Sequence, residues 1–150
     1  MNAEFVNPFY QATTEVFKMM LDLDVSKDNI IQPASNKGDN AVSVKIDVTG
    51  DLSGVIIYRF PKQMPIEMIK IMSGMDIDTI DSFVTSALKE VTNIISGNAA
   101  TNLSSSRYDC DISTPKVYID KAPEIPKDTT SLALPLQTSI GEMEIDIALK

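Results

Sequence analysis

Two neighbouring segments with the composition of β-strands constrain the fold most strongly. Between residues 41 and 49, valine and isoleucine alternate with polar residues, which is the pattern of a strand with one buried face. The run from 52 to 60 is rich in β-branched and aromatic residues, and Gly50-Asp51 between the two segments predicts a tight turn. A hairpin joined in this way favours a largely antiparallel sheet.

Three further segments have the periodicity and the end signals of helices. They cover residues 7–23, 65–74 and 79–103. In the first, Asn7 is expected to cap the helix and Pro8 to occupy its first position, and in the longest one the cap is expected at Asp78 or Thr79. The middle helix begins at proline and ends at Gly74.

The remaining strands are expected in short runs of β-forming residues separated by prolines and polar turns. They are predicted at 30–34, 107–112, 116–119, 131–137 and 142–149, with Pro115, Pro123, Pro126 and Pro135 in connections or at edges. A turn is predicted at 35–40, with Gly38 at a positive φ angle. Since helices and strands do not alternate one by one, we expect an α+β fold, with a largely antiparallel sheet covered by two long helices and a short one.

Composition limits the classes of function. The 150 residues suit one domain, residues 1–150, and a net charge of −8 argues against nucleic acid or an anionic membrane as the main partner. The chain has no histidine and one cysteine, so Ser-His-Asp and Cys-His catalysis, the usual zinc sites and an internal disulfide are excluded. Neither a leader sequence nor an 18-residue apolar run is visible, so we expect a cytoplasmic protein.

The longest predicted helix carries the candidate site. Its apolar residues fall in one broad stripe that is expected to face the core: Phe83, Val84, Ala87, Leu88, Val91, Ile94, Ile95 and Ala99. On the same wheel Ser86, Glu90, Asn93 and Gly97 form a ridge along successive turns, with Lys89 beside it. A glycine inside a helix is costly, so Gly97 suggests close approach of a backbone or a partner, or local bending.

Spacing alone does not make this ridge a site, because a solvated helix face has the same pattern. Glu4 and Asn7 repeat the same Glu-x-x-Asn spacing, although there Asn7 is expected to be a helix cap. Cys110 is interpreted as structural and the methionines as core filler. Asp109 and Asp111 lack the third oxygen ligand that a cation site needs, so no metal site is predicted.

The segment DSFVTSALKEVTNIISGNAATNLS resembles the signature helix of the CheC, CheX and FliY phosphatases of bacterial chemotaxis. The family motif falls on Ser86, Glu90, Asn93 and Pro115. VNPFYQATTEVFKMML and IGEMEIDIAL are similar to the first helix and last strand of the CheX branch. The second Glu/Asn pair of CheC proteins is missing, because Glu15 is followed at the third position by Lys18, and this departure favours the single-site, CheX-like branch.

The resemblance implies an enzyme that dephosphorylates the aspartyl phosphate of a CheY-like response regulator. It implies that Asn93 orients the attacking water, that Glu90 docks on the regulator's lysine, and that the regulator supplies Mg²⁺. Ser86 and Gly97 are small neighbours of the pair and Lys89 lies near Asn93 on the exposed side, so these three residues are expected to contact the regulator. The resemblance also implies a homodimer that joins sheets across subunits. Two alternatives stay open, namely a module that binds the regulator without catalysis and a scaffold that oligomerises through its edge strands.

Overall fold

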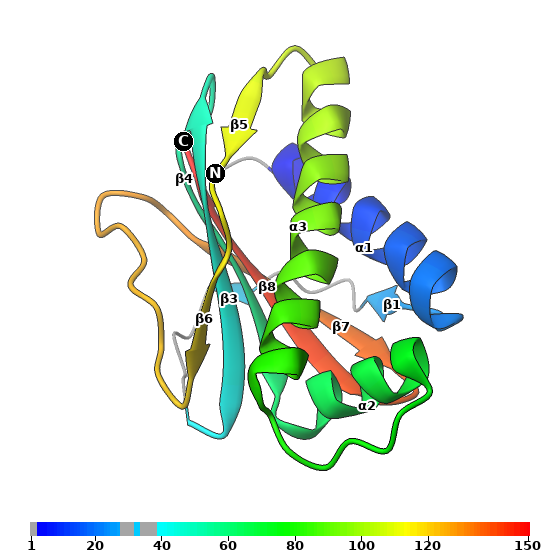
Figure 1. Cartoon of the computed structure of the whole chain (residues 1–150). Helices are drawn as coiled ribbons and strands as arrows, with labels where there is room; N and C mark the ends of the chain where they lie inside the picture. Colours follow the sequence, from blue (N-terminus) through cyan, green and yellow to red (C-terminus); the bar gives the residue numbers. More distant parts are fainter. Residues whose placement is uncertain (1–2, 28–31, 34–38) are drawn as a thin grey trace.

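The computed structural model describes residues 3–27, 32–33 and 39–150, which build one antiparallel sheet with helices on one face (Figure 1). The strands are β1 (Ser26–Lys27), β2 (Gln32–Pro33), β3 (Ala41–Gly50), β4 (Gly54–Pro61), β5 (Cys110–Ile112), β6 (Lys116–Ile119), β7 (Leu132–Thr138) and β8 (Gly141–Leu149). The strand order in the sheet is β1-β7-β8-β4-β3-β5, while β2 also pairs with β7 and β6 with β3. The predicted α+β class with a largely antiparallel sheet is confirmed.

The predicted hairpin forms the centre of the sheet. Strands β3 and β4 pair in antiparallel register, with Ile46 opposite Ile56. Gly54 opens β4 with a φ of 148°, and a Cβ there would lie 1.8 Å from the carbonyl oxygen of Ala148 on β8. Only glycine therefore allows β8 to approach β4 so closely at this point.

Prolines interrupt the pairing at both sides of the sheet, as predicted. Strands β5 and β6 both pair with β3 and are separated by the buried Pro115. Pro135 lies between the two stretches of β7 that pair with β1 and β2. Proline has no N–H to donate to a neighbouring strand, so it fits where the pairing is broken.

Several predicted strand boundaries need correction. The strand expected from 107 begins at Cys110, because Arg107 adopts a left-handed conformation (φ 77°) in the turn that follows the long helix. The short strand β1 has only two residues and was not predicted. Of the strand predicted at 30–34, only Gln32 and Pro33 lie within the described residues, and Gly38 lies outside them.

The helices are η1 (Ala3–Phe5), α1 (Val6–Leu21), α2 (Gln63–Ser73) and α3 (Ser82–Ser105), and Figure 1 shows α1, α2 and α3 on the same face of the sheet. Between them lies the main core, whose largest fully buried side chains include Phe17, Tyr58, Phe60, Met68 and Leu88. The prediction of two long helices and a short one is confirmed. Met64, Met68 and Met143 are core residues as expected, but Met19 and Met75 are exposed, so the interpretation of the methionines as core filler is wrong for these two.

Two predicted helix caps are wrong. Asn7 lies inside the first turn of α1, because the buried Phe5 and Val6 extend the helical backbone toward the N-terminus. Phe5 meets Tyr108 edge to face at 5.3 Å, which holds this start in place. Helix α3 is capped by Asp81 and not by Asp78 or Thr79. The Asp81 carboxylate accepts a hydrogen bond from the N–H of Val84 at 3.0 Å.

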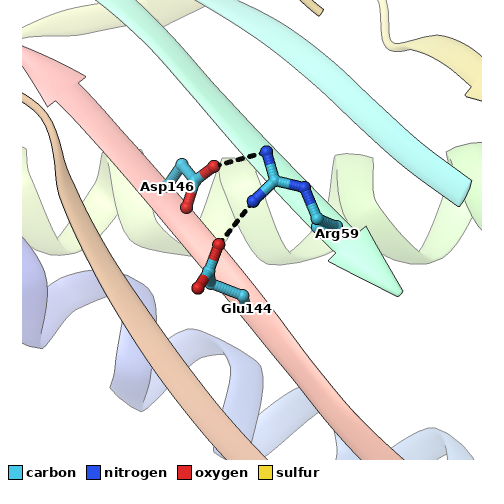
Figure 2. A network of polar contacts seen from close by, with 3 residues as sticks. All are labelled: Arg59, Glu144 and Asp146. Carbon is cyan, nitrogen blue, oxygen red and sulfur yellow. Dashed lines mark hydrogen bonds and ion pairs between the residues drawn. The ribbon is translucent and has the colours of Figure 1, made fainter. Parts of the chain in front are cut away.

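The second face of the sheet carries a small apolar cluster and a buried group of charges. Val55, Ile57 and Ala148 pack there with Ile125 from the connection between β6 and β7, which runs along this side in Figure 1. Figure 2 shows the charged group, in which Arg59 of β4 reaches across to Glu144 and Asp146 of β8.

Within this charged group, an Arg59 Nη atom lies 2.8 Å from an Asp146 carboxylate oxygen, and Asp146 is fully buried. One guanidinium thus faces two carboxylates. Burial raises the pKa of Asp146 to about 8, and the neighbouring Glu144 acts in the same direction, while the Arg59 charge opposes them.

Candidate active site

Helix α3 presents one face to the core and one to solvent. It packs against α1, α2 and strands β3, β5 and β6. Its buried residues are Val84, Leu88, Val91, Thr92, Ile95, Ser96, Ala99 and Leu103. Most of the predicted stripe is therefore confirmed, but it is displaced toward Thr92 and Ser96 and away from Phe83.

Two residues on the buried side of α3 carry hydroxyl groups, and one of them joins the helix to the sheet. The Ser96 hydroxyl and the Tyr58 hydroxyl of β4 lie 2.7 Å apart in a buried hydrogen bond, and burial raises the pKa of Tyr58. Thr92 donates to the carbonyl oxygen of Leu88 at 2.9 Å, so its hydroxyl is satisfied within the helix. Neither residue was predicted to be buried, although hydroxyl side chains four positions apart beside an apolar stripe are a usable signal of a buried polar contact.

Glu90 and Asn93 lie on the opposite, solvent-exposed side of α3. They are three residues apart, so their Cβ atoms are neighbours at about 5–6 Å on adjacent turns. Within the part of the chain that the structure describes, neither side chain makes a hydrogen bond or an ion pair. The carboxylate and the amide are therefore both available to a partner, and Ser86 is exposed one turn before Glu90.

Gly97 leaves a low surface one turn beyond Asn93. A Cβ at this position would meet no atom within 4 Å apart from the helix's own backbone. Close approach of another part of the described chain therefore does not explain Gly97, and contact with a partner or local bending of the helix is left. Lys89 is exposed on the side of α3 next to Asn93, four residues before it, as predicted.

Phe83 departs from the predicted stripe. It was expected in the core, but 45% of its surface is exposed. The reason lies in helix geometry: seven residues make almost two turns, so Phe83 lies in line with Glu90, near the centre of the solvent-facing arc. Its aromatic character suggested burial more strongly than its angular position allowed.

The second Glu-x-x-Asn match has structural contacts of its own. The Glu4 carboxylate accepts a hydrogen bond from the Tyr108 hydroxyl at 3.0 Å, and the contact raises the pKa of Tyr108. Lys18, which follows Glu15 at the third position on α1, forms ion pairs with Asp22 at 3.3 Å and Asp24 at 3.4 Å. Glu4 and Lys18 thus have partners within the chain, whereas Glu90 and Asn93 on α3 have none among the described residues.

The remaining candidate groups form no recognisable site. Cys110 is a free, half-buried cysteine in β5, and the adjacent Asp109 accepts a hydrogen bond from Ser104 at 2.8 Å. Among residues 3–27, 32–33 and 39–150, no three cysteine or acidic side chains gather where they could hold a metal ion. In the same ranges no helix has the length and the apolar character needed to cross a membrane.

Comparison with known proteins shows the family to which this chain is similar. Residues 42–137 match the model of the family described as "Chemotaxis phosphatase CheX". The CheY-P phosphatase CheX of Thermotoga maritima is 23% identical over 150 residues, which cover 99% of this chain and 96% of that protein.

Solved structures have a similar fold over nearly the whole length of this chain. The chemotaxis protein CheX from Desulfovibrio desulfuricans is 30% identical with a TM-score of 0.88, covering 98% of this chain and 99% of that one. A chain in the crystal structure of the CheX-CheY-BeF₃-Mg²⁺ complex from Borrelia burgdorferi is 23% identical with a TM-score of 0.81, and 99% of each chain is covered.

Proposed function

Because the chain belongs to the CheX family of chemotaxis phosphatases, we propose that it hydrolyses the aspartyl phosphate of a CheY-like response regulator. One observation supports this proposal above all. Glu90 and Asn93, the polar pair of the signature helix, are both exposed and without a partner among the described residues, on a helix fixed by its buried side. The proposal treats residues 1–150 as a single catalytic domain that acts in the cytoplasm.

Asn93 is proposed to orient the attacking water. Hydrolysis of an acyl phosphate needs a water in line with the bond between phosphorus and the aspartyl oxygen. As that bond breaks, the aspartate leaves as a carboxylate and the water oxygen becomes part of inorganic phosphate. The carboxylate is a good leaving group, so positioning the water supplies much of the rate and no histidine base is required. An amide can both accept from the water and donate to a phosphoryl oxygen.

Glu90 is proposed to dock the helix by pairing with a lysine of the regulator. Among the described residues Glu90 has no ion-pair partner to release before it binds, and a charge-assisted hydrogen bond in an interface is stronger than one in water. Ser86, Lys89 and Gly97 would border the contact, where the small residues allow close approach. The Mg²⁺ ion would come with the regulator, and the homodimer implied by family resemblance stays a prediction.

Release of phosphate from a phosphorylated CheY-like regulator tests this proposal. Asn93→Ala is expected to abolish the stimulated hydrolysis while binding stays measurable, and Glu90→Ala is expected to weaken binding as well. Asn98→Ala is the matched control, because Asn98 is an exposed asparagine on the same helix, about 140° around the axis from Asn93. Full activity of Asn93→Ala would refute the proposed mechanism, and binding of the regulator without hydrolysis would favour a non-catalytic module.

A further inference from the structure

The exposed face of α3 is unusually poor in charge. Only Lys89 and Glu90 are charged among the 24 residues of this helix, although 23% of the residues of the whole chain are charged. Along the solvent-facing arc the other side chains are small or uncharged, and they include Ser86, Asn93 and Gly97. Protein interfaces have this composition at their centres, where charged residues are depleted and aromatic residues enriched.

Phe83 supplies the aromatic residue on this face. It is 45% exposed in the first turn of α3, where the hydrogen bond between the Asp81 carboxylate and the N–H of Val84 fixes the backbone. A side chain on an ordered backbone loses less entropy on binding than one on a flexible loop. Phe83 lies about 10 Å before Glu90 and about 15 Å before Asn93 along the helix axis, at a rise of 1.5 Å per residue.

We propose that Phe83 is an apolar anchor that docks the receiver domain of the response regulator beside Glu90 and Asn93. This inference rests on the proposed function, since it assigns a second contact to the same partner. It requires that the regulator present an apolar recess about 10–15 Å from its phosphoryl group, at the spacing that the helix geometry sets. Phe83 does not touch the reacting atoms, so it acts as a positioning residue.

Alignment with Glu90 separates Phe83 from the other exposed apolar side chains. Met19 on α1 is more exposed, at 73%, and Ile71 on α2 is exposed to 44%. Single exposed apolar residues are common on protein surfaces and need no explanation. Phe83 shares one helix face with the proposed catalytic pair, so a partner seated over Glu90 and Asn93 would cover it, whereas Met19 belongs to another helix.

Binding of a beryllofluoride-activated, Mg²⁺-bound CheY-like receiver domain tests the anchor. Phe83→Ala is expected to raise the Kd about 10–100-fold, the range for an aromatic hot spot. In phosphate release the KM should rise in parallel, while kcat at saturating regulator stays within about twofold, since a positioning contact remote from the reacting atoms changes mainly binding. Phe83→Leu should retain most of the affinity, and Met19→Ala should bind like the wild type.

The possible outcomes are distinct. If the wild type binds and Phe83→Ala binds equally well, the anchor is refuted while the proposed function stands. If no CheY-like receiver binds the wild type, both fail. A change in oligomeric state by light scattering, with unchanged receiver binding, would assign Phe83 to a contact between copies of this chain and refute the anchor. Phe83→Gln, a polar residue of intermediate size, provides the same test if the alanine variant is poorly folded.

Discussion

Replacement of Asp146 by asparagine should change how stability depends on pH. In the wild type, Asp146 is fully buried next to Glu144 and Arg59, and its pKa is raised from 3.8 to about 8, chiefly by burial. The folded state therefore holds a proton that the unfolded chain releases. By linkage, the contribution of Asp146 is largest below pH 4 and is lost as the pH rises through the folded pKa.

The slope of stability against pH is set by the one proton that the folded state binds at Asp146 and the unfolded state does not. Over the part of the range where Asp146 is protonated in the folded state and ionised in the unfolded state, wild-type stability should fall by up to about 1.4 kcal/mol per pH unit. An asparagine side chain carries no titrating proton, so Asp146→Asn should lack this slope. Hence the unfolding free energy of Asp146→Asn relative to wild type should rise with pH and level off above about pH 8.

Urea unfolding of both proteins at unit steps from pH 5 to 9 measures this difference. Asp128→Asn is the matched control: Asp128 is an exposed aspartate whose pKa is lowered by its hydrogen bond to Lys150, so its contribution is lost only as pH falls toward 4 and below. The control difference should be flat from pH 5 to 9. A flat difference for Asp146→Asn as well would refute the reasoning, because it would mean that the Arg59 charge keeps Asp146 ionised.

Two further substitutions test the buried polar contacts. Arg59→Met should lower the unfolding free energy by about 3–5 kcal/mol at pH 7, because it removes the cation that the Glu144 carboxylate and the buried Asp146 side chain share. A loss under about 1 kcal/mol in urea unfolding would contradict a desolvated network. Ser96→Ala should cost about 1–3 kcal/mol, because the Tyr58 hydroxyl stays buried without a partner, whereas the exposed Ser86→Ala should cost less than about 0.5 kcal/mol. Equal losses for the two serines in thermal unfolding would show that the Tyr58 contact contributes nothing.

The sequence predicted the elements whose pattern is local. Alternation defined β3, and the residues from Lys116 to Ile119 were placed at the observed bounds of β6. The helix caps were less predictable because Asp78, Thr79 and Asp81 have similar capping chemistry, and the choice among them depends on where Val84 meets the core. Strand β1 escaped detection because a two-residue strand has no period of its own.

In the candidate site, too, the features set by local spacing were predicted and those set by the tertiary fold were not. Glu90 and Asn93 are three residues apart on a helix, so the sequence could place their side chains next to each other. Phe83 was misplaced because its aromatic character was given more weight than its angular position, which is in line with the exposed Glu90. The Arg59 network could not be predicted, because it depends on β4 and β8 lying side by side although their residues are far apart in the sequence.

The buried side of α3 determines what its exposed side can do. Thr92 and Ser96 each precede a residue of the exposed ridge, Asn93 and Gly97 respectively, and neighbouring residues differ by about 100° around a helix. If α3 turned by that angle so that Asn93 took the place of Thr92, its amide would enter the core and Ser96 would leave Tyr58. Such a rotation would cost the buried hydrogen bond and bury an amide without a partner, about 1–3 kcal/mol for each unsatisfied group. The contact between Ser96 and Tyr58, together with the apolar residues buried on the same side of α3, therefore favours the orientation in which Glu90 and Asn93 face the solvent. Loss of hydrolysis in Ser96→Ala with its fold intact would link the core to the proposed site.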